Sequence, residues 1–214
     1  MPELPRVDDP EEAAFQRRYG PWSAWTPAGA ATVLGDWSEA WWVAGGWAIE
    51  AFTGRERVHE DIDIAILRRD AKRLSDHLAP AYHCWAIGHG QLRPLDDKWP
   101  DMPDWADQVW VREHAWQPWL ADVVMTPDDD GRWVFKRDPA VTAPLDEVTW
   151  TGADGVRYLN PEVVLAFKAK LGRPKDDADL AATEPLLDAR QRSWLRDTVH
   201  RLHPDHPWLD GPLS

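Results

Sequence analysis

The sequence is poor in cysteine, in positive charge and in long apolar runs. Its one cysteine, Cys84, excludes an internal disulfide framework and a zinc site built from cysteines. No apolar run approaches the roughly 20 residues of a membrane span. Residues 1–5 lack the basic start and apolar stretch of a signal peptide. We therefore expect a cytoplasmic protein that has no membrane partner.

Positive charge is scarce, and the negative charge is concentrated. The 24 Lys and Arg against 37 Asp and Glu give a net charge of −13, of which −12 falls in residues 1–160. Residues 95–130 alone hold ten acidic and two basic residues, together with five of the 16 tryptophans. Such a field repels nucleic acid and favours cationic partners. This window is either an acidic, aromatic binding cleft or an ordinary solvated surface.

The first 159 residues alternate between helical and strand patterns. Thr26-Pro27 is typical of a helix start, and Gly54 is typical of a helix end. We expect helices over 27–36, 47–52 and 69–78. We expect strands over 41–44, 61–66, 81–87, 107–112, 119–125, 132–136 and 145–149. This part is predicted to form a mixed sheet.

The remaining residues, 160–214, are predicted to be helical. Asn160-Pro161-Glu162 combines a cap residue, a proline at the first helical position and an acid in the first turn. Two further helices are expected over 175–187 and 188–202. The fold class is therefore α+β, with a mixed-sheet domain at 1–159 followed by a small C-terminal helical bundle at 160–214.

The chemistry is concentrated in a glycine pair and in two aspartates that follow it. Gly45 and Gly46 stand at a predicted helix start, where backbone N–H groups can approach a phosphate closely. Asp61 and Asp63 are two residues apart in a predicted strand, so both carboxylates should project from one face. Paired carboxylates repel each other unless a cation or proton intervenes. Mg²⁺ is the natural partner, since it prefers oxygen ligands and shares phosphates. Together these features predict a nucleoside triphosphate–Mg²⁺ site.

These residues resemble the core of the nucleotidyltransferase superfamily, and within it the aminoglycoside 2''-adenylyltransferase-like family. The resemblance is carried by VAGGWAIE at 43–50, HEDIDIA at 59–65, WVFKRD at 133–138, YLNPE at 158–162, FKAK at 167–170 and RPKDDADL at 173–180. It implies that 1–159 is the catalytic domain of a nucleotidyltransferase. It also implies ATP as the donor substrate, Mg²⁺ as the cofactor and antibiotic resistance as the biological setting.

The resemblance implies further site residues. A third carboxylate is expected on a neighbouring strand, and Asp122 is the lone acid in an apolar run. Its role is left open between metal ligand and general base, and a solvated strand-edge acid is the alternative. Lys168 is expected to reach the triphosphate, with a solvated position as the alternative. Asp176 and Asp179 are expected to hold Lys168 or Arg173 through ion pairs.

His59 and Lys175 complete the predicted nucleotide-binding set. His59 either contacts phosphate, orients Asp61 or makes a structural hydrogen bond. Lys175 matches the lysine of the family's lysine–aspartate pattern, where an architectural role competes with ligand contact.

The sequence thus predicts an enzyme that transfers a nucleoside monophosphate, AMP from ATP, to a hydroxyl of a small cationic acceptor such as an aminoglycoside. Asp61, Asp63 and Asp122 are the predicted catalytic and metal-binding residues. Gly45, Gly46, Lys168, His59 and Lys175 are the predicted nucleotide-binding residues. The alternatives are a toxin-like or housekeeping nucleotidyltransferase that modifies a protein or tRNA, and a non-catalytic nucleotide-binding module.

Overall fold

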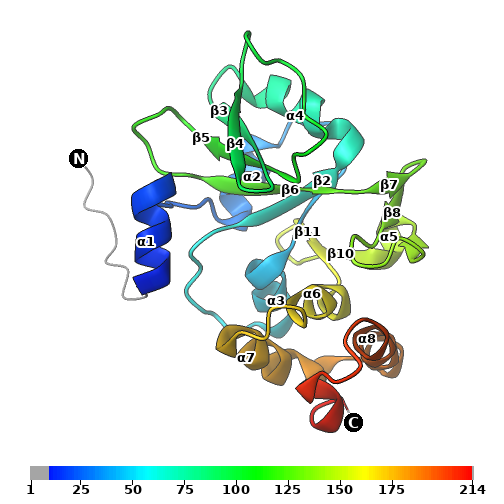
Figure 1. Ribbon diagram of the computed structural model, residues 1–214. Helices are drawn as coiled ribbons and strands as arrows, with labels where there is room; N and C mark the ends of the chain where they lie inside the picture. The colour runs from blue at the N-terminus through cyan, green and yellow to red at the C-terminus, as the bar shows by residue number, and fades with distance from the viewer. Residues whose placement is uncertain (1–9, 214) are drawn as a thin grey trace.

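A computed structural model describes residues 10–213 and places a large mixed sheet at the centre of the fold (Figure 1). The eight strands of this sheet lie in the order β10-β11-β1-β2-β6-β5-β3-β4. They are β1 (Trp41–Val43), β2 (Asp63–Leu67), β3 (His83–Gly88), β4 (Gln91–Leu95), β5 (Gln108–Arg112), β6 (Ala121–Thr126), β10 (Thr149–Thr151) and β11 (Arg157–Leu159). A second sheet has three short strands, β7 (Asp128–Asp129), β8 (Arg132–Val134) and β9 (Thr142–Ala143).

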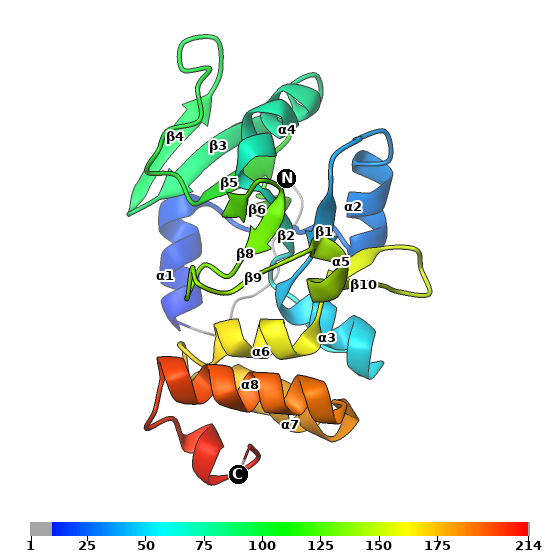
Figure 2. The same ribbon diagram turned by 90° about the vertical axis from the view of Figure 1, so that its right-hand side faces the viewer.

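Helices cover the sheet and its edges. They are α1 (Pro10–Tyr19), α2 (Pro27–Val33), α3 (Gly45–Thr53), α4 (Ala71–Leu78), α5 (Leu145–Val148), α6 (Pro161–Lys168), α7 (Pro174–Thr183) and α8 (Ala189–Leu202). Helices α6, α7 and α8 stack together on one side of the sheet (Figure 2). Helix α3 packs against both α6 and α7. No helix within residues 10–213 is both long enough and apolar enough to span a membrane.

The predicted mixed sheet is confirmed. The main core cluster extends across residue 160, because Ile64 and Ala65 of β2 belong to the same buried cluster as Val164 and Leu165 of α6. One buried core therefore includes residues from both predicted domains, and the division of the chain at 159/160 stays a prediction. Cys84 is buried, and burial raises the pKa of its thiol to about 12.

Several expected elements differ in the structure. The strand expected at 145–149 is wrong, because residues 145–148 form the short helix α5 and the strand begins only at Thr149. Asp146 and Glu147 lie in the first turn of this helix, where acidic side chains favour helix formation. The helix expected over 175–187 ends at Thr183 and continues as a 3₁₀ turn that contains Pro185. Helix α1 and strands β4 and β11 were not predicted.

Aromatic residues form a second, smaller core beside the sheet. Trp22, Trp110 and Trp119 are buried together there. Phe15 and Tyr19 of α1 pack on this cluster, and both rings contact Trp110. Helix α1 is thereby attached to β5, and through the Trp119 indole to the segment before β6.

Candidate active site

The glycine pair opens α3 directly after β1. Gly45 has a φ of +60°, and a Cβ on it would lie 1.9 Å from Asp63 Oδ2. A Cβ on Gly46 would lie 1.6 Å from Arg57 Nη2. Ala44, which precedes the helix, offers no side-chain cap to the first N–H groups. Gly45 therefore requires glycine, whereas a Cβ on Gly46 would mainly displace the Arg57 guanidinium. The N-terminus of α3 has the character of an anion site.

Two carboxylates face each other on neighbouring strands beside this glycine pair. Asp63 begins β2 and is the direct register partner of Asp122 on the parallel strand β6. Register partners in a sheet project from the same face, about 4.8 Å apart along the hydrogen-bonding direction. The expectation that Asp122 lies on a strand adjacent to the aspartate pair is therefore confirmed in geometry.

Both carboxylates are electrostatically strained. Burial, followed by the charge of Asp61, raises the pKa of Asp63 to about 7, and Lys168 partly opposes this. Burial, followed by the charges of Asp63 and Asp61, raises the pKa of Asp122 well above its usual range. Such shifts are typical of groups that exchange protons or neutralise a cation near neutral pH.

Asp61 lies differently from the prediction. The strand begins at Asp63, so Asp61 precedes it and is exposed. The strand cannot extend further on that side because β1 ends at Val43, opposite Ile64, and the chain then turns into α3. The indole N–H of Trp47 donates to the Asp61 carbonyl at 3.1 Å and fixes the backbone there.

The donor set suits a hard divalent cation. Asp122 Oδ2 accepts a hydrogen bond from Gln108 Nε2 at 2.6 Å. Asp122 Oδ1 is buried, and Trp110, its register partner on β5, acts by hydrogen bonding to lower the pKa of Asp122 against the larger effect of burial. Within residues 10–213, no three His, Cys, Asp or Glu side chains are already gathered as a metal-binding group. The Asp63–Asp122 pair therefore offers carboxylate oxygens of the kind Mg²⁺ prefers, and Asp61 would have to turn inward to join it.

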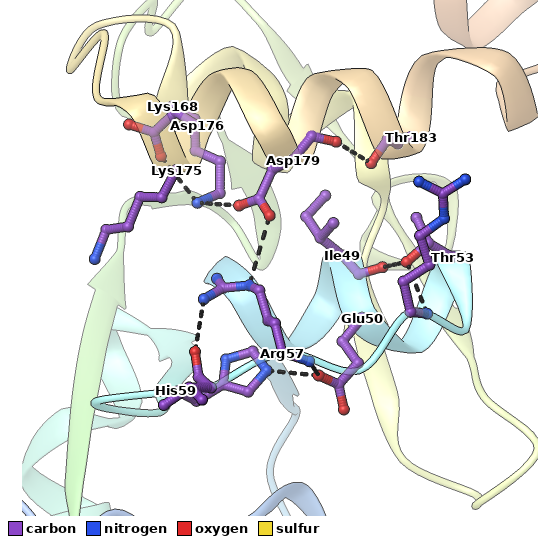
Figure 3. A network of polar contacts seen from close by, with 12 residues as sticks. Ile49, Glu50, Thr53, Arg57, His59, Lys168, Lys175, Asp176, Asp179 and Thr183 are labelled. Carbon is purple, nitrogen blue, oxygen red and sulfur yellow. Dashed lines mark hydrogen bonds and ion pairs between the residues drawn. The ribbon is translucent and has the colours of Figure 1, made fainter.

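Arg57 is a site residue that sequence reasoning missed. Its guanidinium lies over Gly46, and its Nε is 3.5 Å from Asp179 Oδ1 of α7 (Figure 3). Its backbone N–H donates to Glu50 at 2.9 Å. The sequence feature that could have identified Arg57 is its position, two residues before His59 and four before Asp61.

His59 makes the structural hydrogen bond that was one of its three expected roles. Its Nε2 lies 2.8 Å from Glu50 Oε2 (Figure 3), and its ring stacks on Trp47 with centroids 3.9 Å apart. A carboxylate only accepts, so Nε2 carries the hydrogen. Burial lowers the pKa of His59. A direct phosphate contact for this residue stays a prediction.

Lys168 is buried between two carboxylates, which is not the solvated position considered as its alternative. Its Nζ lies 3.1 Å from Asp176 Oδ1 and 2.8 Å from Asp179 Oδ2 (Figure 3). Arg173 also pairs with Asp176, at 2.9 Å. The expected ion pairs are therefore present. Asp176 and Asp179 already neutralise the Lys168 ammonium group in this structure. Contact between Lys168 and a triphosphate stays a prediction.

Lys175 is the more exposed cation of this group. It lies in the first turn of α7, and its Nζ is 3.3 Å from Glu60 Oε2. Its charge and that of Arg173 both lower the pKa of Asp63 against the effect of burial. Positive charge at the start of α7 therefore acts on Asp63.

Two cavities flank the carboxylates. One, of about 170 Å³, lies between the sheet and α6 beside Gly45 and Asp63 and is otherwise mostly apolar. The other, of about 230 Å³, is bordered by Asp61, Asp122 and Gln108. Its remaining lining residues are Glu60, Phe15, Trp22 and Trp110.

The acidic, tryptophan-rich window at 95–130 does not form one surface: its side chains lie in the cavity, in the aromatic cluster and on an exposed hairpin. Of its tryptophans and acids, only Trp110 and Asp122 line the cavity beside Asp61. Trp116 is 91% exposed on the β5–β6 hairpin, whereas Trp119 is 2% exposed in the aromatic cluster. Phe15 and Trp22, which complete the cavity wall, come from outside the window.

Comparisons with known proteins agree with the resemblance seen in the sequence. A family model described as aminoglycoside-2''-adenylyltransferase matches residues 30–85, which contain the glycine pair, Asp61 and Asp63. No curated protein matches this chain significantly.

Three solved structures share the fold. The antibiotic-resistance factor ANT(2'')-Ia in solution is 16% identical, with a TM-score of 0.51 over 79% of this chain and 86% of that chain. The lincomycin-bound lincosamide antibiotic adenylyltransferase LnuA is 17% identical, with a TM-score of 0.51 over 74% of this chain and 94% of that chain. ANT(2'')-Ia in complex with adenylyl-2''-tobramycin is 15% identical, with a TM-score of 0.51 over 79% of this chain and 92% of that chain. The resemblance to adenylyltransferase enzymes is thus confirmed.

Proposed function

We propose that this protein is a Mg²⁺-dependent nucleotidyltransferase that moves AMP from ATP to a hydroxyl of a small cationic acceptor. One observation carries the proposal: Asp63 and Asp122 are register partners on β2 and β6, and the Asp63 carboxylate lies directly over Gly45 at the start of α3. A carboxylate pair next to an uncapped helix N-terminus suits a cation together with a phosphate chain.

The donor triphosphate binds at the glycine pair. Backbone N–H groups at the start of α3 meet its oxygens. Arg57 lies over Gly46, so its guanidinium stands where a phosphate would be and shifts to pair with it. Arg173 and Lys175 add positive charge from α7. Lys168 contributes indirectly, because its ion pairs hold Asp176 and Asp179 in place.

The acceptor hydroxyl attacks the α-phosphorus of ATP from the cavity beside Asp61 and Asp122. A new oxygen–phosphorus bond forms, and the bond to the leaving pyrophosphate breaks. Gln108 holds only Oδ2 of Asp122, so we assign the hydroxyl proton to Oδ1. Mg²⁺, when held by Asp61 and Asp63, would supply the charge that neutralises the phosphates, which leaves Asp122 to take the proton. Gln108 keeps the other oxygen of Asp122 in position.

An antibiotic is the favoured acceptor, with resistance as the biological role. The matched family model is named for an aminoglycoside adenylyltransferase, and solved neighbours act on an aminoglycoside and a lincosamide. The carboxylates and aromatic rings around the cavity suit a cation and a sugar ring. The main alternative is transfer to a protein, since the net charge of −13 opposes tRNA binding.

The test is incubation of the protein with labelled ATP and Mg²⁺ against tobramycin, lincomycin and tRNA. We expect pyrophosphate release and label on an antibiotic. Asp61→Ala should abolish both signals, and the matched variant Asp97→Asn, at an exposed acid that does not line this cavity, should leave them unchanged. Labelled tRNA beside untouched antibiotics would overturn the proposal.

A further inference from the structure

Helix α3 carries the glycine pair at its start, and it also holds the loop that leads into β2. Residues 54–61 form neither helix nor strand, so no regular ladder of backbone hydrogen bonds fixes this loop. Trp47 and Glu50 lie three positions apart on α3 and therefore project from the same face of the helix. Both of these side chains contact the loop.

The two side chains hold the loop at regular intervals. Glu50 Oε2 accepts the backbone N–H of Arg57 at 2.9 Å and lies 2.8 Å from His59 Nε2 (Figure 3). The indole N–H of Trp47 donates to the Asp61 carbonyl at 3.1 Å. The indole ring also stacks on the His59 imidazole, with centroids 3.9 Å apart. Every second residue from Arg57 to Asp61 is therefore attached to α3.

These contacts fix the backbone at both ends of the segment and leave the two functional side chains able to turn. Trp47 contacts the carbonyl of Asp61 and not its carboxylate, and Asp61 is exposed. Glu50 contacts the backbone N–H of Arg57, whereas the guanidinium of Arg57 extends to Asp179. Rotation of either side chain would therefore leave the backbone contacts intact.

A fixed backbone lowers the cost of bringing Asp61 to a cation. Groups that are held in place before a ligand binds lose less conformational freedom when it binds. Asp63 is held by β2, whereas Asp61 precedes that strand, so the contacts with α3 do for Asp61 what the sheet does for Asp63. The same helix presents its first N–H groups at the glycine pair. It therefore also sets the position of Asp61 relative to the phosphate site.

We propose that Trp47 and Glu50 are positioning residues of this site. From one face of α3 they hold the loop backbone, so that the Asp61 carboxylate reaches the cation and the Arg57 guanidinium reaches the phosphates of the donor. The inference rests on the proposed function, because it takes Asp61 as a cation ligand. Neither Trp47 nor Glu50 touches the cation or the donor in this role. Their loss should therefore weaken cation binding without removing a ligand.

The test measures binding of Mn²⁺, which shares the preference of Mg²⁺ for carboxylates, to the full chain by electron paramagnetic resonance, with a non-hydrolysable ATP analogue present. Trp47→Phe keeps a ring against His59 but loses the indole N–H, and should weaken Mn²⁺ binding about three- to ten-fold, the value of one hydrogen bond. Glu50→Ala removes two hydrogen bonds and should weaken it about ten-fold or more. Glu50→Gln should restore binding to near the wild-type level, because a carboxamide oxygen has two lone pairs for the same two donors.

Trp208→Phe is the matched control, because the Trp208 indole N–H donates to Asp177 at 2.7 Å and not to the loop. This variant should bind Mn²⁺ as the wild type does. Urea unfolding of each variant separates the two roles, since a merely structural role lowers stability and leaves Mn²⁺ affinity unchanged. Wild-type affinity in both Trp47→Phe and Glu50→Ala would overturn the proposal. Binding by Glu50→Gln as weak as that by Glu50→Ala would also overturn it, because the charge of Glu50 would then matter and not its hydrogen bonds.

Pyrophosphate release from ATP, measured separately, tests the proposed function. Release by the wild type together with unchanged Mn²⁺ affinity in the variants would overturn the positioning role and leave nucleotidyl transfer standing. Weakened Mn²⁺ binding in Trp47→Phe and Glu50→Ala without any release by the wild type would contradict nucleotidyl transfer and support the positioning role. Failure of the wild type to bind Mn²⁺ would overturn the positioning role.

Discussion

Asp63→Asn should make the protein more stable at alkaline pH while abolishing transfer. The carboxyl of Asp63 has an ordinary pKa of 3.8, and burial followed by the charge of Asp61 raises its pKa to about 7 in the fold. The folded chain thus holds this proton more tightly than the unfolded chain does. An asparagine amide has the same shape and is neutral throughout, so the substitution removes the charge that the fold opposes.

The sign and size of the effect follow from proton linkage. A raised carboxyl pKa lowers the free energy of unfolding progressively as pH rises from about 4 to about 7, after which the loss is constant. Each unit of pKa is worth about 1.4 kcal/mol, so the largest loss is about 4 kcal/mol. Because Asp63 is half-buried, water screens part of this charge, and we expect about 1–3 kcal/mol.

Urea unfolding of both proteins between pH 5 and pH 8, followed by tryptophan fluorescence, measures this gain. The advantage of Asp63→Asn should grow with pH and level off above pH 7. Asp97→Asn, at an exposed position between β4 and β5, should show no such growth. Mg²⁺ should stabilise the wild type more than Asp63→Asn. A gain as large at pH 5 as at pH 8, or no gain at all, would refute the reasoning.

Three further substitutions test other parts of the site. Gly46→Ala puts a Cβ where Arg57 Nη2 stands, 1.6 Å away, so the KM for ATP should rise about ten-fold with little loss of stability. Steady-state kinetics checks this, and an unchanged KM would remove Arg57 from the donor site. Asp122→Asn should lower kcat by about 10²–10⁴ if the residue takes the proton; a kcat close to wild type excludes that role. Lys168→Met leaves Asp176 only its pair with Arg173 and Asp179 only its longer contact with Arg57, so urea unfolding should show a loss of about 1–3 kcal/mol. Unchanged stability would mean that Arg173 and Arg57 compensate the two acids without Lys168.

Local signals in the sequence predict the centre of the site. A glycine pair after a short apolar strand needs only its own neighbours to form the start of a helix. Alternation around Ile62 and Ile64 places Asp63 on the opposite face from the buried isoleucines. The predicted partnership with Asp122 required one more assumption, that the lone acid of an apolar strand lies beside the first pair. The register of β2 and β6 bears this out.

The surroundings of the site depend on contacts between distant segments, which no local pattern reveals. Arg57 pairs with Asp179, 122 positions later, and Phe15 packs on Trp110 of β5. The tryptophan-rich window lies at residues 95–130, yet two of the three aromatic residues that line the cavity, Phe15 and Trp22, come from the segment before Thr26. The number of tryptophans in a window does not reveal which aromatic rings contact one another, because those contacts depend on which segments become neighbours in the fold.

Strand order accounts for how donor and acceptor would meet. The sequence of strands β1-β2-β6-β5 places the glycine pair, which follows β1, on one side of the Asp63–Asp122 pair. Gln108 and Trp110, which belong to β5, lie on the other side. In-line displacement needs the attacking and leaving oxygens on opposite sides of the phosphorus. A triphosphate held over α3 and an acceptor held against α1 approach the two aspartates from these opposite sides. Under the proposed function, the order of four strands therefore provides the geometry of the reaction before any loop is considered.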